Sequence, residues 1–120
     1  MFSQFFRAAL PTVQVGSSTY SGISGSSVTL VCSIISSNPS ATSVKWEKDV
    51  NGVRTDVTTF MASRISGGSV NQPSLTISAL TGSDSGTYYC SAANAVGTGA
   101  SSATTLTVQS KPLVLVGMPY

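Results

Sequence analysis

Hydrophobic and polar residues alternate with a period of two along most of the chain from about residue 12 onward. A period of two places successive side chains on opposite faces of a strand, so each such segment has one apolar and one polar face. No longer stretch keeps a helical period, and the chain has no internal repeat. The pattern therefore predicts an all-β domain. The alternation is clearest in residues 28–34, 43–48, 74–78, 87–91 and 105–108.

Clusters of glycine, proline, asparagine and serine separate these segments at the spacing typical of a sandwich or a barrel. Asn51 and Gly52 stand between two strand-like runs, residues 44–50 and 53–59. Both residues readily accept positive φ, which the central positions of a two-residue hairpin turn require. We therefore expect a tight hairpin at this point, with a second short strand after it before residue 60.

The charge is unusually low: six basic and four acidic residues are 8% of the chain, against a usual ~25%. The 23 Ser and 14 Thr residues supply polar surface instead. The cations form no run, so we expect neither a nucleic-acid partner nor direct membrane contact. The chain has no histidine and thus lacks the commonest general base and metal ligand.

Catalytic motifs are also missing from the sequence. No Gly-x-Ser-x-Gly elbow occurs, and the glycines at 97 and 99 are not followed by the third glycine of a dinucleotide-binding loop. The carboxylates of Glu47, Asp49, Asp56 and Asp84 form no evident acid/base pair. We expect a chain that is not an enzyme and that binds no cofactor or metal.

The two cysteines, Cys32 and Cys90, are 58 positions apart. Two thiols without histidine cannot complete a zinc site, and a redox pair would more often be spaced as Cys-x-x-Cys. A structural disulfide formed in an oxidising compartment explains them best, and two free core thiols are the alternative.

One tryptophan and one tyrosine fit a disulfide between two sheets. Trp46 follows Cys32 by 14 positions and can pack against the disulfide in the centre of a core. Tyr88 precedes Cys90 by two positions, on the same face of its strand, and its hydroxyl can bond back to the turn that contains Asp84. We expect Trp46, Tyr88, Leu75 and Ile77 in the core.

In this order and spacing the motifs resemble those of the immunoglobulin superfamily, over residues 12–109. The resemblance implies an all-β, immunoglobulin-like Greek-key sandwich of two sheets with one inter-sheet disulfide. It rests on Val28, Leu30 and Cys32 of strand B, Trp46 of strand C, Leu75 and Ile77 of strand E, Asp84, Gly86, Tyr88 and Cys90 of strand F, and Leu106 and Val108 of strand G.

The resemblance also implies that Arg64 pairs with Asp84 across the bottom of the sandwich. The subtype lies between the variable and intermediate sets, with a C′ strand and room for a short C″ strand after Val50. The short sequence phrases of the chain are similar to those of immunoglobulin modules in ectodomains of invertebrate surface receptors, such as adhesion molecules and receptor tyrosine kinases.

We divide the chain into an N-terminal extension (1–11), the domain (12–109) and a C-terminal linker or tail (110–120). Residues 1–11 do not read as a signal peptide, because Arg7 interrupts the apolar part. An extracellular domain without its own export signal is expected to be a piece of a longer secreted or membrane-anchored protein.

Two classes of function fit such a domain: a recognition module for protein ligands, including a second copy, and a structural spacer in a tandem array. A secreted innate-immune domain is a further alternative. For recognition we favour the outward face of strands C, C′, F and G, which would form a weak homodimer. Tyr89 is its best candidate because tyrosine is enriched at interfaces.

Other candidates on that face are Lys45, Glu47, Asp49 and Ser91. In a symmetric dimer, Glu47 and Asp49 would repel their copies in the partner unless Lys45 or Lys48 neutralises them. The loops 36–42 and 95–99, at the other candidate surface, are short and lack aromatic or arginine anchors.

Overall fold

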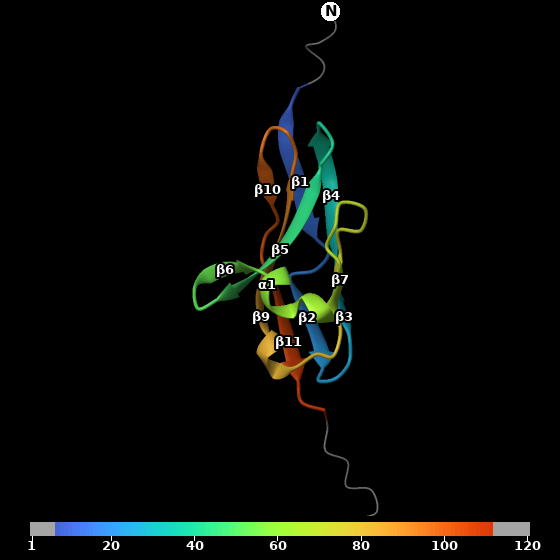
Figure 1. Ribbon diagram of the computed structural model, residues 1–120, viewed down its shortest axis with the longest axis vertical. Coiled ribbons are helices and arrows are strands. Elements are labelled where there is room, and N and C mark those ends of the chain that lie inside the picture. The colour runs from blue at the N-terminus through green and yellow to red at the C-terminus, as the bar shows by residue number, and fades with distance from the viewer. Residues whose placement is uncertain (1–6, 112–120) are drawn as a thin grey trace, which may run out of the picture.

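The computed structural model describes residues 7–111, and they form two packed β-sheets joined by short turns (Figure 1). The strands are β1 (Ala9–Val15), β2 (Thr19–Ile23), β3 (Val28–Leu30), β4 (Cys32–Asn38), β5 (Ser43–Val50), β6 (Val53–Asp56), β7 (Ile65–Gly67), β8 (Leu75–Ile77), β9 (Gly86–Ala93), β10 (Thr98–Ala100) and β11 (Thr104–Gln109). One helical turn, α1 (Thr58–Met61), and two 3₁₀ turns, η2 (Ala62–Arg64) and η3 (Gly82–Asp84), lie between strands.

The first sheet has the order β2-β11-β9-β5-β6, with β10 also pairing with β9. These strands correspond to A′, G, F, C and C′ of the expected sandwich. The second layer contains β3-β8-β7 and the pair β1-β4, which correspond to B, E, D and A. β3 and β4 are one strand interrupted only at Val31. The predicted two-sheet Greek-key sandwich is therefore confirmed.

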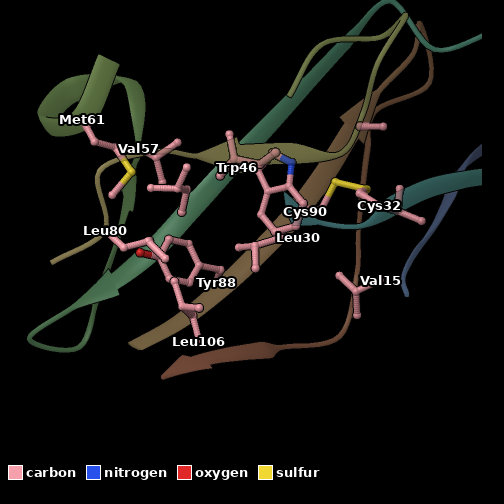
Figure 2. Packing of buried hydrophobic residues seen from close by; sticks show 14 residues of the cluster. Val15, Leu30, Cys32, Trp46, Val57, Met61, Leu80, Tyr88, Cys90 and Leu106 are labelled. Carbon is pink, nitrogen blue, oxygen red and sulfur yellow. A yellow bond between two sulfur atoms is a disulfide. The ribbon is translucent and has the colours of Figure 1, made fainter. Parts of the chain in front are cut away.

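The core lies where the apolar faces of the two sheets meet (Figure 2). Trp46 and Tyr88 come from the first sheet, and Leu75 and Ile77 come from β8 in the second; all four are 2% exposed or less. The indole N–H of Trp46 donates to the Pro73 carbonyl oxygen at 2.8 Å. The large aromatic side chains are thus buried without leaving a polar atom unpaired.

Cys32 at the start of β4 and Cys90 in β9 form a disulfide, with Cα atoms 6.5 Å apart. The bond joins the two sheets, and Figure 2 shows Trp46 packed beside it. Trp46 is also the register partner of Cys90 in the β5–β9 pair. The disulfide and the tryptophan therefore fix the same point of the core.

The hairpin at Asn51 and Gly52 forms as predicted, with positive φ at both residues and Val50 paired with Val53. The strand after it is shorter than expected. It ends at Asp56, whose carboxylate accepts hydrogen bonds from the Thr58 amide at 2.9 Å and the Thr58 hydroxyl at 2.7 Å.

These two bonds turn the chain into α1, whose first two residues fall within the run 53–59 that was predicted as strand. The turn buries Val57 and Met61 under the core, with 1% and 2% exposure. The described chain passes from α1 through η2 to β7, so the short C″ strand that the sequence allowed is not formed.

Strand β1 begins at Ala9, inside the segment that we assigned to an N-terminal extension. The Ala9 carbonyl oxygen accepts a hydrogen bond from the side chain of Asn94, the residue after β9, at 2.8 Å, so this part of the segment is tied to the turn that follows β9. Residues 1–6 and 112–120, which hold the remainder of both predicted terminal segments, lie outside the described residues. No helix among residues 7–111 is long and apolar enough to cross a membrane.

The disulfide closes a loop of 58 positions and should dominate the stability of the domain. We expect replacement of both cysteines by alanine to lower the free energy of unfolding by about 4 kcal/mol, because the unfolded chain regains the entropy of an open loop. Urea unfolding monitored by Trp46 fluorescence measures the change. The control is Ser33→Ala on the exposed side of β4, expected to change stability by less than about 0.5 kcal/mol. A loss below about 1 kcal/mol in the double variant would contradict the assigned role.

Candidate functional site: the outer face of β5, β6 and β9

The outer face of the first sheet is set by the register of β5 on β9. Trp46 is paired with Cys90 and both point into the core, so their neighbours in sequence point outward. Glu47 lies opposite Tyr89 on β9 and opposite Asp56 on β6. We call the cluster of Lys45, Glu47, Asp49, Arg54 and Tyr89 the outer face.

Tyr89 lies at the centre of this face with its ring covered on one side by Arg54. The guanidinium carbon of Arg54 lies 3.6 Å from the ring centroid. Arg54 reaches Tyr89 diagonally across β5, since it stands two residues before Asp56. A cation over an aromatic face contributes about 0.5–1 kcal/mol at an exposed site and holds both side chains in place.

Arg54 was not among the residues that the sequence singled out. The signal for it was present, because the Asn51-Gly52 turn fixes the hairpin register and pairs Asp49 with Arg54. Following that register one strand further would have placed Arg54 beside Tyr89.

The charges on this face are locally balanced. The Lys45 ammonium lies 3.6 Å from a Glu47 carboxylate oxygen, and the Lys45 side chain is 51% exposed. The Asp49 carboxylate accepts a hydrogen bond from the Gly52 amide at 2.8 Å, which uses one of its oxygens in the hairpin turn. Glu47 and Asp49 therefore present less free negative charge to a partner than their sequence positions indicated.

Two expectations for this region are wrong. Ser91 is on the predicted face but only 6% exposed, because it lies mid-sheet between Lys45 and Ala100 and its short side chain is covered. Lys48, which we expected among the surface charges, is 8% exposed and shares the inward side of β5 with Trp46.

The buried Lys48 ammonium has a defined place in the lower core. It donates to the Ser83 carbonyl oxygen at 2.5 Å and lies 5.8 Å from the centre of the Tyr88 ring. Burial lowers the pKa of Lys48, while the nearby Asp84 carboxylate opposes that shift. Lys48 therefore cannot form an ion pair with the acidic residues of the outer face.

Arg64 and Asp84 meet at the bottom of the sandwich. Two guanidinium nitrogens of Arg64 donate to the two carboxylate oxygens of Asp84, each at 2.8 Å. The Thr81 amide donates to the same carboxylate at 2.9 Å, and the Tyr88 hydroxyl donates to the Asp84 carbonyl oxygen at 2.6 Å. The ion pair thereby connects η2 with η3, and the Tyr88 hydroxyl connects η3 with β9.

The protonation of Asp84 is coupled to this network. Burial by itself raises the pKa of the carboxyl, but the hydrogen bonds from Arg64 and Thr81 outweigh it, with help from the charges of Arg64 and Lys48. The pKa of Asp84 thus lies below its ordinary value. Burial also raises the pKa of the Tyr88 hydroxyl.

The opposite end of the domain is organised by Asn94, which the sequence analysis missed. Its amide nitrogen donates to the carbonyl oxygens of Ala9 and Pro39 and to the Ser37 hydroxyl, at 2.8, 3.0 and 3.1 Å. Its amide oxygen accepts from the backbone of the turn that follows β9. The loop end is therefore held by one buried amide and is built mainly for structure.

We expect Asp84→Asn to destabilise the domain by about 3 kcal/mol at pH 7, because Arg64 loses its ionic partner at a largely buried site. Since the folded pKa is lowered, the stability from Asp84 is present above about pH 4 and is lost as the pH falls through the folded pKa.

Urea titrations at pH 7 and pH 3 test both statements. The loss between the two pH values should be smaller in Asp84→Asn than in the unmodified chain. Glu47→Gln, which removes the 3.6 Å ion pair with the half-exposed Lys45, serves as the control and should cost less than about 1 kcal/mol. Equal acid sensitivity of Asp84→Asn and the unmodified chain would contradict the assignment.

The comparisons with known proteins agree with this geometry. Among solved structures, the chain is similar to the tandem Ig repeats of Dlar (TM-score 0.66, 27% identity, covering 91% of this chain and 53% of that one). It is also similar in fold to a marsupial T cell receptor (TM-score 0.69, 19% identity, 88% and 54%). The chain spans about half the length of each. A family model described as "Immunoglobulin domain" matches residues 11–94, so the chain belongs to the immunoglobulin domain family.

Proposed function

We propose that this chain is an extracellular protein-recognition module that binds through the outer face of β5, β6 and β9. The observation that carries the proposal is the stacking of Arg54 on Tyr89 at 3.6 Å in the centre of the outer face. Tyrosine and arginine are two of the three residue types that are enriched among energetically dominant interface residues.

The stacked pair is suited to binding because its two side chains are already ordered. Immobilising a flexible side chain at an interface costs about 0.5–1.5 kcal/mol, and Arg54 has lost part of that freedom before a partner arrives. The rest of the sheet presents small hydroxyl side chains such as Thr105 and Thr107, both exposed, which are cheap to desolvate compared with charges.

A second copy of the chain is the first partner to test. On a two-fold axis the same face meets itself, so its charges must be compatible with their own copies. Lys45 lies beside Glu47 and Arg54 lies opposite Asp49, so these two acidic residues each have a basic neighbour. The Asp56 carboxylate, opposite Glu47, accepts hydrogen bonds from Thr58. We propose a weak homodimer through this face, with a different surface protein as the alternative partner.

The wider context is also a proposal. One similar solved structure contains tandem Ig repeats of Dlar, which supports a place in the ectodomain of a surface receptor or adhesion protein. A disulfide between Cys32 and Cys90 supports an oxidising, extracellular location. A receptor tyrosine kinase is one such parent protein, and a spacer in a tandem array is the competing function.

Sedimentation velocity over a range of concentrations tests the homophilic form. We expect self-association of the unmodified chain, weakened at least about fivefold by Tyr89→Ala and by Arg54→Ala, because truncation of a dominant interface residue costs more than 1 kcal/mol. Ser33→Ala, exposed on β4 in the other layer of the sandwich, is the control and should associate normally.

A chain that stays monomeric at every concentration would overturn the homodimer. Unchanged association in both Tyr89→Ala and Arg54→Ala would move the interface away from this face. Thermal unfolding of each variant checks that the fold is retained, which is expected since both side chains lie outside the core.

A further inference from the structure

The outer edge of β5 is only half paired. Strand β6 pairs with Glu47 to Val50. Beyond that point, among the described residues, the Val57 amide donates to the Trp46 carbonyl oxygen at 3.1 Å, and no strand lies beside Ser43, Val44 or Lys45 on this side. An unpaired strand edge offers backbone donors and acceptors to an incoming strand.

The register shows which backbone groups are free. The amide and carbonyl of Cys90 both bond with Ser101, on the side of β9 away from β5. The backbone N–H and C=O of its partner Trp46 must then point to the outer edge of β5, as the hydrogen bond from the Val57 amide to the Trp46 carbonyl oxygen shows. Since backbone direction alternates along a strand, Val44 also directs its N–H and C=O to the open edge.

A pocket of about 260 Å³ lies directly beside this edge. Its apolar lining includes Val44, Trp46, Ile65 and Leu75, which come from both sheets. Gly67 and Gly68 form the wall on the β7 side, where no side chain narrows the space. A Cβ atom on Gly68 would come within 3.2 Å of the Trp46 ring, so any side chain there would crowd this wall.

We propose that this edge binds an extended peptide segment of another protein as an added strand, antiparallel to β5. The ligand residue opposite Val44 exchanges two main-chain hydrogen bonds with it, as opposite residues do in a narrow antiparallel pair. Its side chain lies on the same face of the sheet as that of Val44, so it enters the pocket and is apolar.

The neighbouring ligand residues follow from the same register. The preceding residue lies opposite Lys45, whose side chain is 51% exposed and whose ammonium lies 3.6 Å from Glu47. An acidic side chain at this ligand position would share that ammonium with Glu47. The following residue lies opposite Ser43 and is small and polar. Val57 occupies the edge at Trp46, so the ligand strand begins opposite Lys45 and continues past Ser43.

A second copy of this chain fits the edge poorly. Its own β6 pairs along the same edge of β5 directly after Trp46. In an antiparallel pairing centred on Val44, the β6 of the second copy would clash with the residues just before Ser43 in the first copy. The site shares Lys45 with the outer face, but its centre is Val44 and Gly68 and not Tyr89 and Arg54, so the two proposals are tested by different residues.

The test is a titration of the ¹⁵N-labelled domain with the peptide acetyl-Glu-Val-Thr-Val-Thr-amide, whose first valine is placed opposite Val44. We expect saturable shifts of the Val44, Lys45 and Gly68 amide signals and slower hydrogen exchange at Val44. Tyr89 and Arg54 should be unaffected, so failure here is distinguishable from failure of the outer face.

All control changes are made in the peptide, which leaves the folding of the domain untouched. N-methylation of the first valine removes its donor to Val44 and should weaken binding about threefold to tenfold. N-methylation of the next residue, whose N–H points away from β5, is the matched control and should leave affinity unchanged. Glycine in place of the first valine should weaken binding about tenfold, because the pocket is left empty.

Three results would overturn the proposal. They are no saturable shift at Val44, equal weakening by the two N-methyl peptides, and shifts of the same signals with protein concentration in the absence of peptide. The last would assign the edge to a second copy of the chain.

Discussion

The pairing of Trp46 with Cys90 across β5 and β9 is the constraint on which the rest of the structure depends. Cys90 is covalently tied to Cys32 in the other sheet, and the Trp46 ring packs beside that bond. Because side chains alternate along a strand, fixing one pair fixes the direction of every residue on both strands. A slip of one position would expose the tryptophan and bury Tyr89.

Both candidate binding surfaces follow from that single register. It turns Tyr89 and Glu47 outward, where Arg54 from the neighbouring hairpin stacks on the tyrosine ring. It also turns the backbone of Val44 toward an edge that β6 leaves open. The same strand therefore presents side chains on one surface and main-chain groups on another, and these two kinds of surface recognise different chemistry.

The few charges of the chain are divided between folding and surface. Arg64, Asp84 and Lys48 lie in or beside the lower core, where low solvent exposure makes each interaction consequential. The remaining charges on β5 and β6 are two basic residues, Lys45 and Arg54, and three acidic residues, Glu47, Asp49 and Asp56. The low charge content thus leaves a hydroxyl-rich surface, and the stacked pair of Tyr89 and Arg54 lies on its outer face.

The sequence by itself determined the strands with clear alternation and the Asn51-Gly52 hairpin, because period-two patterns and turn residues act locally. The local pattern left a sandwich or a barrel open, and the two-sheet sandwich was implied by the family resemblance. Only the tertiary structure decided which side chains meet across strands. It buried Lys48 and Ser91, stacked Arg54 on Tyr89, and made Asn94 the tie between three segments.

The one-turn helix after β6 was decided in the same way. Residues 53–59 alternate well enough to predict a strand. The Asp56 carboxylate instead accepts a hydrogen bond from the Thr58 amide, and the burial of Val57 and Met61 stabilises the turn. The Asp56–Thr58 contact is local, but the burial of Val57 and Met61 depends on segments far apart in the chain, and a local pattern carries no information about that burial. The sequence could therefore define the faces of each strand but not what covers them.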